Sequence, residues 1–139
     1  MKKVEGAPRP ALGDQLVVEV FVADLGRSLA VYTALGFKLE RRDQHFVVLR
    51  FDGREFLLDE HSDLPPSSGL ARANIRILTD DIDAMWALVQ RLGLRVSQPI
   101  ANRYYGLRDF TVLDPDGFGL RFAGMIGKDD ARNALLGDY

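Results

Sequence analysis

Two stretches of the chain share one pattern of apolar and polar positions, although they lie far apart. Each opens with a run rich in β-forming residues, VVEVFV from Val17 and NIRIL from Asn74. Each run leads to an Asp, Asp24 or Asp81, that can cap free N–H groups at the start of a helix. A Leu-Gly pair and an apolar residue close each stretch, which signals the end of a helix. The pattern therefore predicts a strand followed by a helix, twice.

Both predicted helices are amphipathic. Apolar side chains recur at helical spacing along one stripe of each helix, and we expect these stripes to pack on a sheet. The first stripe holds Leu25, Leu29, Tyr32 and Leu35, and the second holds Ile82, Met85 or Trp86, Val89 and Leu92. Met85 and Trp86 are interpreted as core residues rather than as parts of a binding site.

A second pair of stretches, FVVLRFDGREFLL from Phe46 and FTVLDPDGFGLRF from Phe110, continues the repeat. In both, Asp-Gly separates two β-rich runs, which is a strong hairpin signal. The module thus reads strand, helix, strand and hairpin (βαβββ), and it occurs twice. We expect a first module at residues 16–60, a linker at 61–71 and a second module at 72–124. A flexible leader at 1–15 and a tail at 125–139, which can form a short helix, complete one structural domain.

The composition of the chain excludes several classes of function. The chain has 139 residues, 47% of them hydrophobic, and its net charge of −2 with mixed signs gives no electrostatic footprint for nucleic acid or an anionic membrane. No apolar run approaches the roughly 20 residues of a membrane-spanning helix. The absence of cysteine excludes disulfides and thiolate chemistry. The N-terminus lacks the apolar core of a secretion signal, and we expect a cytoplasmic location.

The duplicated module, with VADLGRSLAVYTALGF in its first copy and YYGLRDFTVLDPDGFGLRF in its second, resembles the vicinal oxygen chelate superfamily. That superfamily includes glyoxalase I, extradiol dioxygenases, and fosfomycin- and bleomycin-resistance proteins. The resemblance runs from Leu16 to Ala123 and is strongest to the bleomycin-resistance type. It implies an α+β fold in which two tandem βαβββ modules form cupped mixed sheets with the helices outside. It does not fix function, because this fold serves enzymes and plain binders alike.

The resemblance also implies where a metal would bind. Metal-dependent members hold one divalent ion with side chains from the first and last strands of each module. The matching positions here are Val17, Leu57, Asn74 and Arg121. Two are aliphatic, one is a neutral amide and one is a permanent cation that repels a metal ion. We therefore expect no metal and no cofactor.

The expectation that no metal binds holds if the four ligand positions are shifted along the strands, and it also holds when the two histidines are considered. A shift of two residues brings only Asp59 or Glu55 to the second position. His45 precedes a strand and His61 lies in the linker, so neither has ligand spacing, and both are interpreted as solvated loop residues.

The candidate ligand site follows from strand parity, since alternate residues share a face. The face of the metal positions carries Glu19, Phe21, Asp59, Asn74, Arg76 and Arg121. This mix of apolar and charged groups suits a ligand with an apolar body and polar edges. Alternatively, Glu19 with Arg121, or Asp59 with Arg76, form a purely structural ion-pair network, since buried charges need partners.

The loop NRYYGLRD in the second module is the other candidate. Tyr104 and Tyr105 offer flat rings and hydroxyls, and Arg108 can stack or bind an anion. The resemblance implies that this loop borders a ligand groove; the alternative is a packed loop with exposed tyrosines.

Three functions remain in competition. The first is a non-catalytic, metal-free small-molecule binder that sequesters an antibiotic or toxic compound, and it implies a symmetric homodimer. The second is a metal-dependent lyase, isomerase or dioxygenase, which the ligand positions disfavour. The third is a metal-free enzyme on the same cup, with Glu19 or Asp59 as a lone general base. The first is preferred.

Overall fold

The structure is a computed structural model that describes residues 16–69 and 71–137; the leader expected at 1–15 lies outside them. The first half of the chain forms β1 (Val18–Val22), α1 (Leu25–Ala34), β2 (Lys38–Arg42), β3 (Phe46–Phe51) and β4 (Arg54–Glu60). The second half forms β5 (Asn74–Leu78), α2 (Ile82–Arg91), β6 (Arg95–Asn102), β7 (Leu107–Leu113) and β8 (Gly119–Met125). The short helix expected in the tail is α3 (Lys128–Leu135).

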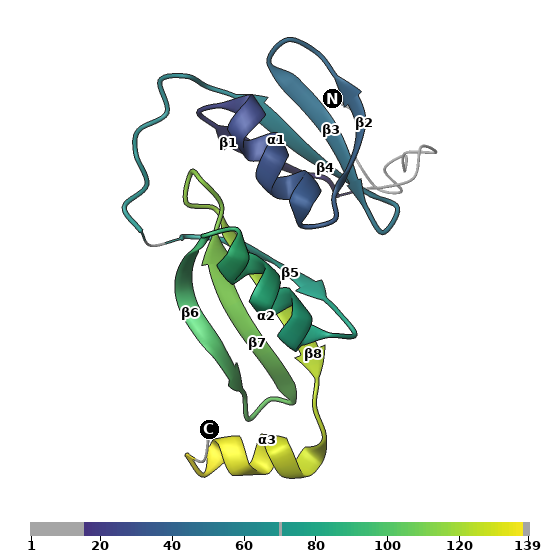
Figure 1. Ribbon diagram of the computed structural model, residues 1–139, viewed down its shortest axis with the longest axis vertical. Helices are drawn as coiled ribbons and strands as arrows, with labels where there is room; N and C mark the ends of the chain where they lie inside the picture. Colours follow the sequence, from purple (N-terminus) through teal and green to yellow (C-terminus); the bar gives the residue numbers. More distant parts are fainter. Residues whose placement is uncertain (1–15, 70, 138–139) are drawn as a thin grey trace, which may run out of the picture.

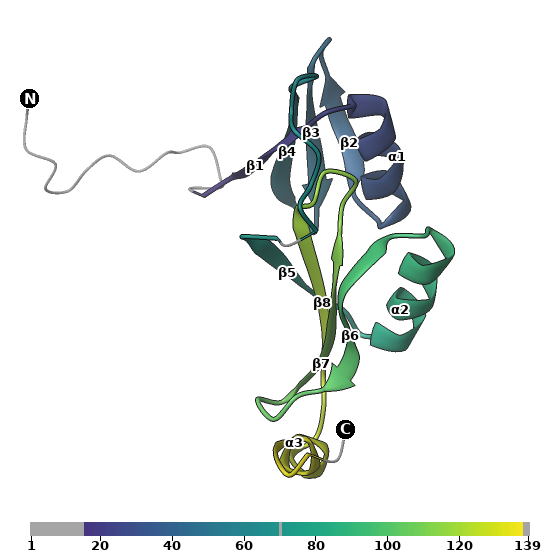
Figure 2. The same ribbon diagram turned by 90° about the vertical axis from the view of Figure 1, so that its left-hand side faces the viewer.

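Each half forms its own four-stranded mixed sheet, which confirms the α+β class and the βαβββ modules. The strand orders are β1-β4-β3-β2 and β5-β8-β7-β6, and only the first strand of each module pairs in parallel, with β4 and β8 respectively. The modules follow one another along the long axis of the molecule (Figure 1). Both α1 and α2 lie on the same side of the sheets, and no helix among the described residues lies on the opposite faces (Figure 2). We call these the open faces.

Alternation along the strands divides core from open face. Val20 and Val22 in β1, and Ile77 in β5, are buried beneath the helices. The helix stripes pack as expected, with Tyr32 against Phe37 and Phe56, and Trp86 against Phe110 at 5.0 Å between ring centroids. Leu92 is the exception among the expected core positions, because it is 37% exposed at the end of α2.

The two hairpins expected from Asp-Gly differ in their turns. Asp52 and Gly53 both have positive φ, 50° and 76°, between the paired residues Phe51 and Arg54. This is the tight two-residue turn that Asp-Gly favours. In the second module Asp114 N–H bonds to the Phe118 carbonyl at 2.8 Å, so three residues, 115–117, form the turn. Gly117, at φ 93°, supplies the left-handed residue that such a turn requires.

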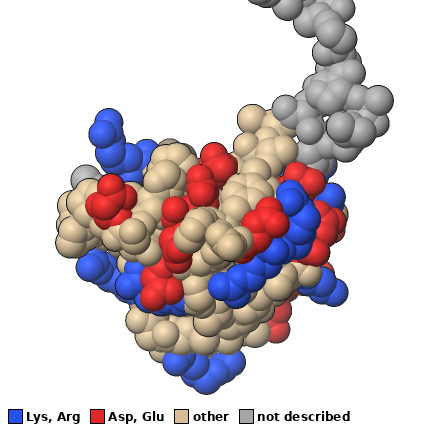
Figure 3. All heavy atoms as spheres, turned by 90° about the horizontal axis from the view of Figure 1, so that it is seen from above, with Lys and Arg blue, Asp and Glu red and all other residues tan. Residues whose placement is uncertain are grey.

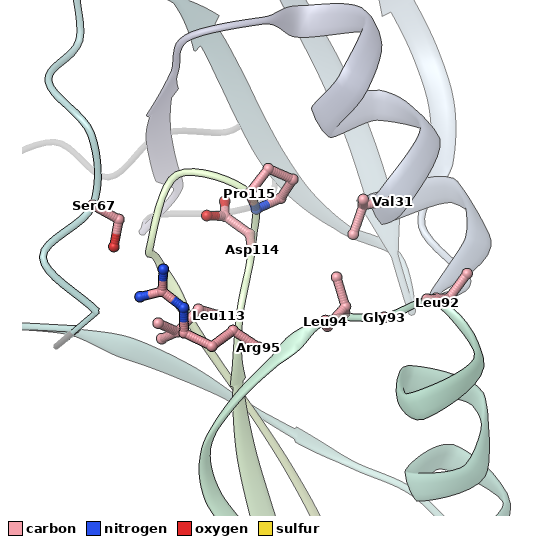
Figure 4. A pocket seen from close by; sticks show the side chains of 9 residues that line it. All are labelled: Val31, Ser67, Leu92, Gly93, Leu94, Arg95, Leu113, Asp114 and Pro115. Atoms are coloured by element: carbon pink, nitrogen blue, oxygen red, sulfur yellow. The ribbon is translucent and has the colours of Figure 1, made fainter.

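The longer turn joins the modules. The Tyr32 hydroxyl of α1 donates to Asp114 Oδ2 at 2.7 Å, and Arg27 Nη2 bonds Asp116 Oδ1 at 3.0 Å. Asp114 Oδ1 also accepts the N–H groups of Asp116 and Phe118, each at 2.9 Å. Beside this joint lies a pocket of about 310 Å³ between α1, the linker and the start of β6 (Figure 4).

Candidate functional site

The open faces carry the polar and aromatic side chains that strand parity placed there. On the first sheet Glu19 pairs in register with Leu57 and Phe21 with Asp59. On the second sheet Asn74 pairs with Gly119 and Arg76 with Arg121. The alternate residues of the same strands belong to the core. Glu19, Phe21, Asn74 and Arg76 are exposed, while Asp59 and Arg121 are half-buried.

Arg121 belongs to a hydrogen-bonded group of four side chains from β7, β8 and the β6–β7 turn, which we call the Asp109 cluster: Arg103, Tyr105, Asp109 and Arg121. Arg121 contacts Asp109 Oδ2 through Nε at 3.1 Å and Nη2 at 2.6 Å. Arg103 Nε donates to Asp109 Oδ1 at 2.8 Å. The Tyr105 hydroxyl donates to Asp109 Oδ2 at 2.8 Å and contacts Arg121 Nη2.

Asp109 is the centre of this cluster. Its side chain is 0% exposed, whereas Arg103 and Arg121 keep 16% and 19% of their side-chain surface in water. Burial alone raises the pKa of Asp109, but the hydrogen bonds from Arg103, Arg121 and Tyr105 outweigh it and hold that pKa below its ordinary value. Burial and the bond to Asp109 raise the pKa of the Tyr105 hydroxyl. The cluster is thus a carboxylate bound by two guanidiniums.

The expected partners of Arg121 are wrong. Neither Glu19 nor Asp59 reaches it, because both lie on the first sheet whereas Arg121 lies on the second. Asp109 was missed by sequence reasoning, although a signal for it exists. Phe110 is a core residue, so in an antiparallel hairpin its neighbour Asp109 shares the face of Arg121.

The expected pair of Asp59 with Arg76 is also wrong. Asp59 Oδ2 lies 3.2 Å from His61 Nε2, and the His61 ring packs on Phe21 with centroids 4.2 Å apart. His61 therefore belongs to the open face rather than to a solvated loop.

The other histidine stands outside the open faces. His45 is 71% exposed and contacts Glu60 Oε1 at 3.1 Å. Glu60 also accepts the Leu25 N–H at 2.8 Å, at the start of α1. This backbone bond, followed by the bond to His45, lowers the pKa of Glu60.

The three candidate residues of the loop NRYYGLRD lie in different places. Tyr105 belongs to the Asp109 cluster, and its ring centre lies 5.6 Å from the guanidinium carbon of Arg121. Tyr104 is 64% exposed and contacts Tyr105 edge to face. Arg108 points to the helix side, where it bonds Asp83 of α2 at 3.0 Å and Asn102 at 3.2 Å. Arg108 thus belongs to β7 rather than to the loop in which sequence reasoning placed it, and its role in ligand binding stays a prediction.

The four positions that correspond to metal ligands do not fit a divalent ion. Val17 and Leu57 have no donor atoms, and the guanidinium of Arg121 is held by Asp109. Among residues 16–69 and 71–137, no group of three or more His, Cys, Asp or Glu side chains is arranged to bind a metal.

Taken together, two βαβββ modules with open sheet faces and a polar cluster on one of them define a two-module sheet protein of the glyoxalase type. The chain belongs to the Glyoxalase/Bleomycin resistance protein/Dioxygenase superfamily, whose sequence model matches residues 15–122. No curated protein matched the chain in a sequence comparison.

Solved structures support the same fold. A glyoxalase/bleomycin resistance protein/dioxygenase from Alicyclobacillus acidocaldarius is 22% identical with a TM-score of 0.66, over 84% of this chain and 95% of its own. A bleomycin-binding protein complexed with bleomycin is 21% identical with a TM-score of 0.64, over 81% and 99%. A glyoxalase/dioxygenase from Nostoc punctiforme is 17% identical with a TM-score of 0.70, over 84% and 94%. At these identities the similarity establishes the fold alone.

In the end-on view of the first module, acidic and basic side chains are interspersed (Figure 3). Within the part of the chain that the structure describes, no helix is long and apolar enough to cross a membrane.

Proposed function

We propose that this protein binds a small organic molecule on its open sheet faces without a metal ion, and that it does so as a homodimer. The observation that carries the proposal is the Asp109 cluster. A fully buried carboxylate fixes Arg121 at a position where a metal-dependent relative would place a metal ligand. A pre-organised guanidinium beside a tyrosine suits binding and orienting a ligand, because little side-chain entropy is then lost on association.

Exposed apolar side chains on the open faces support a ligand with an apolar body. Phe21 is 49% exposed and Leu78 is 64% exposed, both on open faces. Exposed apolar side chains rimmed by polar groups are typical of ligand-binding surfaces. The bleomycin-binding neighbour binds its ligand on the same fold. Sequestration of a toxic compound or antibiotic is the role that such binding would serve here.

The test is a binding screen with metal controlled. Protein purified without chelator is screened with aromatic compounds of all charges by equilibrium dialysis, before and after treatment with EDTA. We expect stoichiometric binding that EDTA leaves unchanged, and elemental analysis far below one metal per chain. Phe21→Ala should weaken binding, whereas Leu136→Ala, at a 73% exposed site beyond the sheets, should not. Binding that disappears with the metal would contradict the proposal.

A further inference from the structure

The open face of the second sheet carries more positive than negative charge. Arg76 and Arg121 are register partners on the parallel strands β5 and β8, so their side chains rise from adjacent positions on one face. Arg103 reaches the same place through its bond to Asp109. Arg103 and Arg121 share the Asp109 carboxylate, and Arg76 adds a third guanidinium to this face.

The hydrogen bonds leave donors free. Arg121 uses Nε and Nη2 on Asp109 and Tyr105, and its Nη1 bonds no other described residue. Arg76 is exposed and makes no ion pair or hydrogen bond with the residues that the structure describes. A guanidinium has five N–H donors in a planar fork that matches a carboxylate, so these two side chains can hold an anion between them.

The other acidic groups of the second module are engaged elsewhere or lie at the ends of the sheet, whereas Asp52 and Glu55 of the first module line a pocket together with Arg76. Asp81 caps α2, and Asp83 bonds Arg108 on the helix side. Asp114 and Asp116 bond α1. Two further acids of α3, Asp129 and Asp130, share that helix with Lys128 and Arg132. None of them bonds a guanidinium of the open face.

A hollow lies further along β5 and β8 than the two arginines, neither of which lines it. It has a volume of about 440 Å³ and is lined by Leu78, Thr79, Asp80, Ala123 and Met125. Leu78 and Ala123 are register partners two residues beyond Arg76 and Arg121, hence on the same face. Leu78 and Met125 are 64% and 80% exposed, so the hollow offers apolar surface to a ligand body. Asp80 is its one acidic lining residue.

We propose that the ligand is an aromatic or otherwise apolar carboxylate, with its anionic group between Arg76 and Arg121 and its apolar body in the hollow beside Leu78. This inference rests on the proposed function and names the ligand class of the same site. This ligand class differs from the cations that other binders take, because the positive charges of Arg76 and Arg121 repel a positively charged ligand.

Three isosteric probes test the charge of the ligand: 2-naphthoate, 2-naphthamide and 2-naphthamidine. They share one fluorescent ring system and differ in being anionic, neutral and cationic at neutral pH. We expect 2-naphthoate to bind about tenfold more tightly than the amide, as suits a charge-assisted bond, and the amidine to bind most weakly. The preference should shrink as salt is added.

Paired variants test the position. Arg76→Gln removes an exposed side chain without a described partner, so the fold should persist, and the preference for naphthoate should fall about tenfold. Arg91→Gln, an exposed site at the end of α2 on the helix side, is the matched control and should leave the preference unchanged. Equal binding of acid and amide, or no effect of Arg76→Gln, overturns the inference.

The outcomes also separate this inference from the proposed function. If compounds of the metal-controlled screen bind but 2-naphthoate does not, the anionic ligand class is wrong and the small-molecule binder stands. If no compound binds at all, both fail. If naphthoate binds with the expected order and the order is lost in Arg76→Gln, both are supported.

Discussion

Asp109 is fully buried on β7, and it accepts hydrogen bonds from three side chains at once. An ionised carboxylate without water is costly unless charges and donors compensate it. The two guanidiniums do so and are themselves held in place. A single residue therefore fixes the orientation of Arg121 and Tyr105, which are the groups we expect to meet the ligand.

Asp109→Asn should destabilise the protein by about 2–4 kcal/mol, because it leaves two partly buried guanidiniums without their counter-charge. Urea unfolding followed by circular dichroism measures the change. The control is Asp83→Asn, which breaks an ion pair in which the Asp83 side chain is 68% exposed and which should cost about 1 kcal/mol or less. Equal effects of the two substitutions would show that Asp109 has no special role.

For single residues, the sequence predicts the sheet face that a side chain occupies better than it predicts the hydrogen-bond partner of that side chain. Arg121 was placed correctly on the open face because parity follows from its core neighbours Leu120 and Phe122. Its partner was not, because the contact with Asp109 depends on the register of β7 against β8. Arg108 was misplaced for a related reason: a position near a turn was taken as loop, whereas it continues the alternation of β7 on the helix side.

At the scale of elements, the repeat predicts both hairpins, but it does not predict that the second turn bonds α1. Phe51 and Arg54 enclose a two-residue turn, whereas the three-residue turn after Asp114 brings two carboxylates onto α1. Asp-Pro-Asp-Gly reads as a turn in any context. That it also joins the modules depends on where α1 lies, which is a tertiary fact that no local pattern contains.

Asp114 makes this joint sensitive to pH. Its burial, which the bonds from Tyr32 and the turn N–H groups only partly offset, raises the pKa of Asp114 above 3.8. A carboxyl with a raised folded pKa contributes stability that is complete below its unfolded pKa and is lost as pH rises through the folded value. Asp114→Asn cannot ionise and avoids that loss.

We therefore expect the stability of Asp114→Asn relative to wild type to increase as pH rises from about 4 to about 7. The measurement is the free energy of unfolding in urea at several pH values for both proteins. Asp129→Asn, on the exposed side of α3, is the control and should follow the wild-type curve. A difference between Asp114→Asn and wild type that is flat with pH, or that runs the other way, would contradict this account of the joint.

At the scale of the whole molecule, both open faces look to the same side, since α1 and α2 cover the other (Figure 2). They leave Phe21, Leu78 and Met125 exposed. Periodicity predicted the strands and helices of two tandem modules, and the family resemblance implied sheets with the helices outside. Neither could predict that the modules lie end to end along the long axis of the molecule, because that depends on the joint at Asp114.

Exposed apolar faces of this kind favour a second copy of the chain as their cover, since two-fold pairing is the commonest closed arrangement. We expect a homodimer, with a mass twice the 15.5 kDa of one chain in sedimentation equilibrium at micromolar concentration. Phe21→Glu places a charge on the open face and should shift the protein towards monomer, because an unpaired charge is costly in an interface. Leu136→Glu, directly after α3 and at a 73% exposed site, should remain dimeric. A wild-type protein that sediments as a monomer would mean that the open faces stay in water, and the ligand site would then have to be complete within one chain.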